Sequence, residues 1–329
     1  MLPGLGNYYN VELGRLRNRR SAGNLIGKVV SGVLDLRASA MYHSQNTCHS
    51  QDACRRHRAH SEVRNLSTRT APTSIDFESA SVPIWREALV GLDWVALRTS
   101  RVYRGLDIPH GDGAPVILIP GFLGADPYLA EMHGWLKRIG YRPYMSGIGQ
   151  NADCPNVLAQ RLYVTIDRAY RDTARKVDLV GHSLGGIIAR VAAVRYPRRV
   201  AKVISLGSPV NAVRTHPIVI TAARFIRGRV QWRRRTGVES ECYTGRCQCS
   251  FLDHVQQDIP RSVTHASIYT KSDGIVDWRS CLEPNGDPNI EVRGTHIGLA
   301  FNPEVFRNVA DLLAGNGNGH RAPVDQRSS

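Results

Sequence analysis

One short segment constrains the fold of this chain more than any other. The short, mostly apolar run Val177-Asp-Leu-Val180 leads into Gly181-His-Ser183-Leu-Gly185, and largely apolar residues continue from there to Arg195. A short, mostly apolar run of this kind predicts a strand that is buried on both faces, and the stretch after it has the length of a helix. Glycines two positions before and after a serine let strand and helix meet at a very sharp turn, which leaves the serine exposed above the sheet.

The same alternation of strand and helix continues through most of the 329 residues. It predicts the α/β class, with a mostly parallel sheet covered by helices on both faces. The predicted strands are Pro115–Ile119, Arg142–Met145, Val177–Val180, Lys202–Leu206, Ser267–Thr270 and Asn289–Val292. The predicted helices are Pro83–Tyr103, Asp126–Gly140, Val157–Tyr170, Leu184–Arg195 and Val305–Leu313.

Two of these helices allow more detailed predictions. In the second helix, Asp126 is the expected N-cap because Pro127 follows it at the first helical position. The first helix has apolar residues at helical spacing, which predicts that this face lies on the core. The residues of that face are Trp85, Leu89, Leu92 and Ala96.

The positive charge is distributed unevenly along the chain. The net charge is +15, and +7 of it falls on residues 1–70, which are rich in Arg, Ser, Asn and His. We expect residues 1–70 to be a basic, disordered extension, residues 83–315 to form the α/β domain and residues 316–329 to be a flexible tail. A targeting peptide within residues 17–40, or a true start at Met41 or later, stays open, and so does a cytoplasmic or exported location. No run approaches the ~20 apolar residues of a membrane-spanning helix.

Two further segments carry groups that can cooperate with Ser183. Asp273 follows a late strand and His296 follows the last one, so the order along the chain is serine, acid, histidine. In such a set Ser183 is the nucleophile, His296 is the general base, and Asp273 orients the imidazole. Asp277 is the competing acid, and we prefer Asp273 because it stands at the strand end.

A glycine-rich turn, residues 119–124, follows the first strand of the sheet. A turn of this kind can aim backbone N–H groups at the space above Ser183, where an acyl transfer develops an oxyanion. The expected donors are the amides of Phe122 and of Leu184, the residue after the serine. A plain strand-terminating turn is the alternative.

Residues from about 83 to 315 resemble bacterial α/β-hydrolases of the lipase and esterase type. The resemblance rests on Pro120–Gly124, Gly181–Gly186, Leu206–Pro209, Ser272–Val276 and Thr295-His296. It implies the α/β-hydrolase fold and a serine hydrolase that cleaves carboxylic esters, lipid esters among them, without a metal or an organic cofactor. Many bacterial lipases carry His where this chain has Pro120, which bears on the geometry of the oxyanion site. Acyl transfer by the same residues, and a non-catalytic binding protein on this scaffold, remain alternatives.

Residues 209–260 interrupt the strand–helix rhythm, and the resemblance implies a lid-like insertion there. An apolar stretch, Ile218–Phe225, is interleaved with and followed by six arginines and Trp232 between residues 224 and 235. Such a face could lie on an anionic membrane surface, and a solvated basic helix is the alternative. Nucleic acid is not an expected partner, because no recognition motif accompanies the charge.

The seven cysteines cannot all pair within one chain, because their number is odd. Cys242, Cys247 and Cys249 lie in the insertion, and their spacing lacks the second pair that a zinc site needs. One of them could form a disulfide with Cys281 and tie the insertion to the loop after Asp273. Buried, reduced thiols are the alternative.

Overall fold

A computed structural model describes residues 77–210, 213–234, 250–283 and 287–315. Contacts divide the chain into two units, Met1–Thr68 and Arg69–Ser329, and all described residues belong to the second. The expected extension over residues 1–70 and the expected tail over residues 316–329 lie outside the described residues.

A six-stranded sheet forms the centre of the second unit, and all its described pairings are parallel. The strand order is β3-β2-β4-β5-β7-β8, so β4, which leads into Ser183, is central. The strands are β2 (Pro115–Ile119), β3 (Arg142–Met145), β4 (Val177–His182), β5 (Val200–Leu206), β7 (Thr264–Tyr269) and β8 (Asn289–Glu291). The parallel sheet predicted from the apolar runs is therefore present, with strand ends within a few residues of the expected ones.

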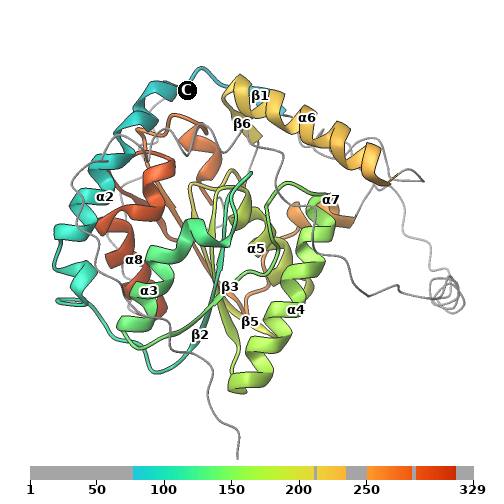
Figure 1. Ribbon diagram of the computed structural model, residues 1–329. Helices are drawn as coiled ribbons and strands as arrows, with labels where there is room; N and C mark the ends of the chain where they lie inside the picture. Colours follow the sequence, from blue (N-terminus) through green and yellow to red (C-terminus); the bar gives the residue numbers. More distant parts are fainter. Residues whose placement is uncertain (1–76, 211–212, 235–249, 284–286, 316–329) are drawn as a thin grey trace, which may run out of the picture. The chain divides into compact units, whose positions relative to one another are not determined.

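Helices cover both faces of this sheet (Figure 1). The longer helices are α2 (Val90–Thr99), α3 (Ala130–Arg138), α4 (Pro155–Thr173), α5 (Leu184–Arg195), α6 (Pro217–Arg234), α7 (Ser250–Val255) and α8 (Pro303–Leu313). Short 3-10 helices are η2 (Ile84–Leu89), η3 (Val102–Arg104), η4 (Asp126–Leu129), η5 (Trp278–Cys281) and η6 (Ile297–Phe301). None of the helices in the described ranges is both long and apolar enough to cross a membrane.

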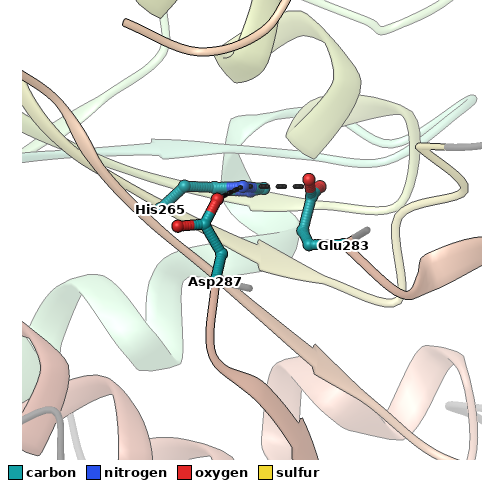
Figure 2. Close-up of side chains that lie close together, drawn as sticks. All are labelled: His265, Glu283 and Asp287. Carbon is teal, nitrogen blue, oxygen red and sulfur yellow. Dashed lines mark ion pairs between the residues drawn. The ribbon is translucent and has the colours of Figure 1, made fainter. Parts of the chain in front are cut away.

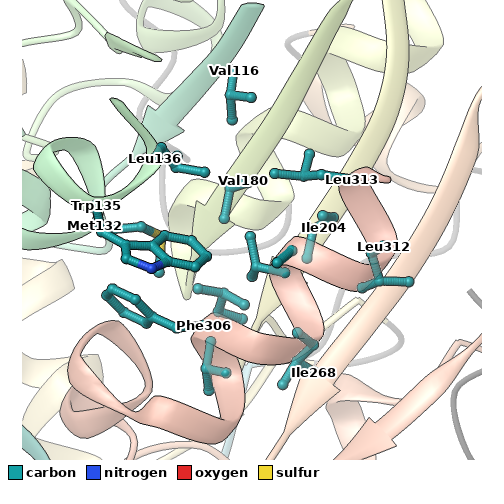
Figure 3. Packing of buried hydrophobic residues seen from close by; sticks show 14 of the residues in the cluster. Val116, Met132, Trp135, Leu136, Val180, Ile204, Ile268, Phe306, Leu312 and Leu313 are labelled. Carbon is teal, nitrogen blue, oxygen red and sulfur yellow. The ribbon is translucent and has the colours of Figure 1, made fainter. Parts of the chain in front are cut away.

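Alternate residues of one strand serve two separate cores. Val116 and Leu118 of β2 pack with α3 and α8 on one face, whereas Ile117 and Ile119 pack with α4 and α5 on the other. Figure 3 shows the first core, where the ring centroids of Trp135 and Phe306 lie 4.6 Å apart. This two-sided burial explains why the strands read as continuous apolar runs.

The predicted orientation of the first helix is wrong. The segment consists of η2, α2 and η3, and its apolar stripe faces solvent: Trp85 is 67% exposed and Leu92 is 68% exposed. Leu97 is fully buried, and so is most of the Glu87 side chain. Helical spacing identified an apolar face, and we expected that face to pack on the core. The opposite face packs there instead, because the carboxylates of Glu87 and Asp93 accept hydrogen bonds from the histidine loop.

The predicted N-cap at Asp126 is also wrong. The N-cap of η4 is Ala125, and no side chain caps it. The Asp126 carboxylate instead accepts hydrogen bonds from Ser146 Oγ (2.5 Å) and Gly147 N (3.1 Å), which lie just beyond β3. Asp126 therefore ties two loops together at the ends of neighbouring strands.

The region after β5 contains β6 (Val213–Thr215), α6 and α7 in its described parts. β6 pairs in parallel with β1 (Phe77–Ser79), a short strand pair that the sequence did not predict. Three residues on each side are too few to give a periodicity signal. Residues 211–212 and 235–249, with Cys242, Cys247 and Cys249, lie outside the described residues.

Cys281 is a fully buried thiol rather than half of a disulfide. It packs with Tyr269 and Val276, and burial raises the pKa of its thiol. The proposed bridge to the insertion is therefore not part of this structure, and apolar packing takes its place.

We expect Phe306→Ala to lower the free energy of unfolding by about 3–5 kcal/mol, because it leaves a cavity between α8 and the sheet. Phe225→Ala is the matched control. That ring is 65% exposed, so its loss should cost less than about 0.5 kcal/mol. Urea unfolding of both variants measures the difference, and equal losses would contradict this packing.

Candidate active site

Ser183 has the strained backbone that its position between strand and helix requires. Its φ is +53° and its ψ is −124°, a region that non-glycine residues rarely occupy. A Cβ on Gly181 would lie 2.5 Å from the backbone of Gly185, and one on Gly185 would lie 2.3 Å from the carbonyl oxygen of Ile119. Only glycine fits at both positions, so these residues permit the sharp turn.

Asp273 and His296 are in direct contact. His296 Nδ1 lies 2.6 Å from Asp273 Oδ2, and both side chains are almost completely buried. The other carboxylate oxygen accepts the amides of Ile275 (2.8 Å) and Val276 (2.7 Å). Because those bonds fix Oδ1, the free lone pairs of Oδ2 are directed at the imidazole, which therefore carries a proton on Nδ1.

The charge of Asp273 determines the acidity of this histidine. Burial alone lowers the pKa of His296, but the attraction of the Asp273 carboxylate and its hydrogen bond outweigh burial, and the net pKa is raised. The competing acid, Asp277, lies elsewhere. It caps η5 by accepting Arg279 N (3.1 Å) and pairs with Arg214 at 3.6 Å.

His182 joins the serine turn to the histidine loop. Its Nε2 lies 2.9 Å from the carbonyl oxygen of His296, so Nε2 carries the proton and donates it. Burial, and next the charge of His296, lower the pKa of His182 to about 3, which keeps its imidazole neutral. Ser183 N in turn donates to Leu206 O at 2.8 Å. Serine, histidine and acid thus belong to one bonded cluster of loops.

The glycine-rich turn predicted to hold an oxyanion lies beside the serine. A Cβ on Gly121 would lie 3.1 Å from Ser183 Cβ, so the backbone next to Phe122 approaches Ser183 closely. Asn151 holds this turn in place: its side-chain Nδ2 donates to Pro120 O (2.8 Å), and its backbone carbonyl accepts Leu123 N (2.9 Å). Pro120 therefore keeps the turn in place through its carbonyl, without a side-chain donor.

Sequence reasoning missed the group that holds the two loops of the acid and the histidine together. The carboxylate of Glu87 in η2 accepts Gly274 N (2.9 Å), His296 N (3.0 Å) and Ile297 N (2.8 Å). Asp93 of α2 accepts the Thr295 hydroxyl at 3.2 Å on the other side of the histidine. The available signal was the spacing of Glu87 and Asp93, which lie six residues apart on the side of the segment away from the apolar stripe.

A second cluster of ionisable side chains lies at the other end of β7, away from Asp273 (Figure 2). His265 Nδ1 is 3.4 Å from Glu283 and 3.6 Å from Asp287. Such ligands suit a divalent cation, but the Arg190 guanidinium already lies 3.1 Å from Glu283. Burial lowers the pKa of His265, yet the two carboxylates outweigh it and the net pKa is raised. The Arg190–Glu283 ion pair, with His265 beside the same carboxylate, ties α5, the helix after Ser183, to the loop before β8.

We expect Glu87→Gln to lower the free energy of unfolding by about 2–3 kcal/mol, because its amide –NH₂ would face a backbone N–H that the carboxylate now accepts. Glu131→Gln is the matched control. Glu131 is a partly exposed helical carboxylate paired with Arg98, so its loss should cost about 1 kcal/mol or less. Chemical denaturation of both variants measures the two free energies of unfolding. If Glu87→Gln lowers this free energy as little as the control does, Glu87 does not hold the two loops together.

Parts of this chain are similar in sequence to known proteins. A family model for the alpha/beta hydrolase fold matches residues 173–241, which include the serine turn. A triacylglycerol lipase of Burkholderia plantarii is 28% identical over 156 residues, 45% of this chain and 42% of the lipase. A triacylglycerol lipase of Pseudarthrobacter phenanthrenivorans is 33% identical over 104 residues, 29% of this chain and 33% of the lipase. The chain thus matches less than half the length of either relative.

Among solved structures, a metagenomic carboxyl esterase is similar with a TM-score of 0.48 and 13% identity, over 76% of this chain and 97% of the esterase. The parallel sheet, the strained serine turn and the family model matched around that turn show that the chain has the α/β-hydrolase fold.

Proposed function

We propose that the protein hydrolyses carboxylic esters through an acyl-enzyme on Ser183. The observation that carries the proposal is the buried Asp273–His296 pair, joined through His182 to a serine held in a strained turn. A merely structural serine has no need of positive φ or of an ion-paired histidine beside it. Two curated relatives are named triacylglycerol lipases, which supports an ester substrate of the lipid class.

The first half of the reaction forms the acyl-enzyme. Ser183 Oγ attacks the carbonyl carbon as His296 Nε2 takes its proton, and the imidazolium formed is stabilised by Asp273 through Nδ1–H. The proton then passes to the leaving alkoxide, which departs as an alcohol. Because Asp273 raises the pKa of His296, the imidazole is a stronger base than an isolated buried histidine.

Backbone amides stabilise the charge that develops on the carbonyl oxygen. We assign this role to the amides of Phe122 and Leu184, the latter at the N-terminus of α5, where the helix dipole favours negative charge. The support is the close approach of the Gly121 turn to Ser183 and its anchoring by Asn151. Donors fixed in advance need no reorganisation when the oxyanion forms.

Water completes the cycle. His296 removes a proton from water, the hydroxyl adds to the acyl carbon, and Ser183 leaves as the free alcohol with that proton. An alcohol in place of water would give acyl transfer, so the two reactions share every residue and differ only in the acceptor. Product analysis with and without an added alcohol separates them.

The region after β5 is the proposed lid over the acyl site. In its described part, α6 exposes Ile218 (58%) and Phe225 (65%), which supports an apolar outer surface there. Contact of its Arg-rich part, residues 224–235, with an anionic membrane stays a prediction.

A fluorophosphonate probe should label the folded protein on Ser183 and abolish p-nitrophenyl ester hydrolysis. Ser183→Ala should lose both properties, with kcat falling by a factor of order 10⁶, while its unfolding curve stays close to that of the parent. Mass spectrometry locates the label. Absence of labelling in folded protein would favour a non-catalytic binding protein.

The pH dependence of kcat/KM tests the base. The raised pKa of His296 means that the rate should increase with pH, with an apparent pKa above the ordinary 6.5, since the protonated imidazole cannot act as a base. Asp273→Asn should lower that apparent pKa and reduce kcat by a factor of about 10⁴. Asp277→Asn should change neither, and the reverse order would make Asp277 the acid.

A further inference from the structure

The apolar stripe of η2 and α2 faces solvent, and it is the most concentrated apolar surface in the described residues. Six of the ten large hydrophobic side chains that are exposed lie within residues 84–95. They are Ile84, Trp85, Leu89, Leu92, Trp94 and Val95. Single exposed apolar residues need no explanation, but a contiguous patch of this kind marks an interaction site.

Contacts on the inner side of the segment fix its orientation, so the apolar patch is a permanent part of the surface. Glu87 and Asp93 bond the histidine loop, and Leu97 is fully buried in the core. Because these three contacts fix which side of the segment faces inward, the two tryptophans and Leu92 cannot turn toward the core. In Figure 1, α2 lies at the margin of the molecule.

Arginines accompany the patch, whereas the acids of the segment face inward. Arg86 lies 5.8 Å over the ring of Trp85, and Arg98 lies 4.9 Å over the ring of Trp94. Arg98 is paired with Glu131, while neither Arg86 nor Arg104 has an acidic partner within the described residues. The outer surface is therefore apolar, rich in Trp and positively charged.

Charge decides among the possible occupants. Residues 1–70 carry a net charge of +7, so this part of the chain is repelled by an arginine-bearing surface. In a symmetric dimer through this face, the arginines of both copies would face one another. An anionic lipid surface offers phosphates to arginine, and its interface is where tryptophan side chains are most stable.

We propose that η2 and α2 form the surface by which the protein binds an anionic lipid membrane, with Trp85, Leu92 and Val95 entering the interface. This inference assigns the lipid contact to a segment other than the insertion. It does not depend on the proposed ester hydrolysis, because binding is measured without turnover.

The experiment measures co-sedimentation of the full chain with phosphatidylcholine vesicles that contain about one third phosphatidylglycerol, and with pure phosphatidylcholine vesicles. We expect binding to the anionic vesicles that weakens with salt, and a loss of about tenfold or more in the Trp85→Gln/Leu92→Gln double variant. Arg86→Gln/Arg104→Gln should weaken binding and reduce its salt dependence. Circular dichroism melting curves confirm that each variant is folded.

Two matched variants separate this surface from others. Val164→Gln alters a side chain on α4 that is as exposed as Trp85, at 67%, and should bind like the parent. Phe225→Gln alters the insertion, and binding lost there but kept in the double variant would overturn the proposal. Equal binding to neutral and anionic vesicles would also overturn it. So would a parent protein that is dimeric without lipid and becomes monomeric in the double variant.

Discussion

The left-handed backbone of Ser183 is the constraint on which the arrangement of the site depends. A turn this sharp is possible only because Gly181 and Gly185 lack side chains, and it brings β4 and α5 into close contact. The strain is held by the burial of α5 and by the Arg190–Glu283 ion pair, which binds that helix to the loop before β8. Strain of this kind persists only where its surroundings are over-determined.

Much of the fold could be predicted, because buried parallel strands have a simple signature. β2, β3 and α5 have the predicted bounds, and the other strands differ by a few residues. The pairing of Asp273 with His296 was also expected from their places at strand ends, and the structure places them in contact. These features are local in sequence or follow from the shared edge of a parallel sheet.

The features that sequence did not reveal depend on distant partners. Glu87 looked like one of several charged residues in its segment, because nothing nearby in the chain shows that backbone amides bind its carboxylate. Asn151 and His182 gave no signal for the same reason: their partners are main-chain groups, which leave no mark on composition. The orientation of the stripe containing Trp85 was wrongly predicted, because helical spacing shows that one face is apolar but does not show what lies against that face.

The bond between Glu87 and His296 joins residues 209 positions apart in the chain. During synthesis, η2 and α2 therefore leave the ribosome long before their inner carboxylates can meet the histidine loop. The elements that surround the serine turn, β2, β4, β5 and α5, all precede the base in the chain. Loop-closure entropy makes such distant contacts slow to form. On the proposed function, the nascent chain would thus lack its base until almost the whole described chain is made, and would stay inactive until then.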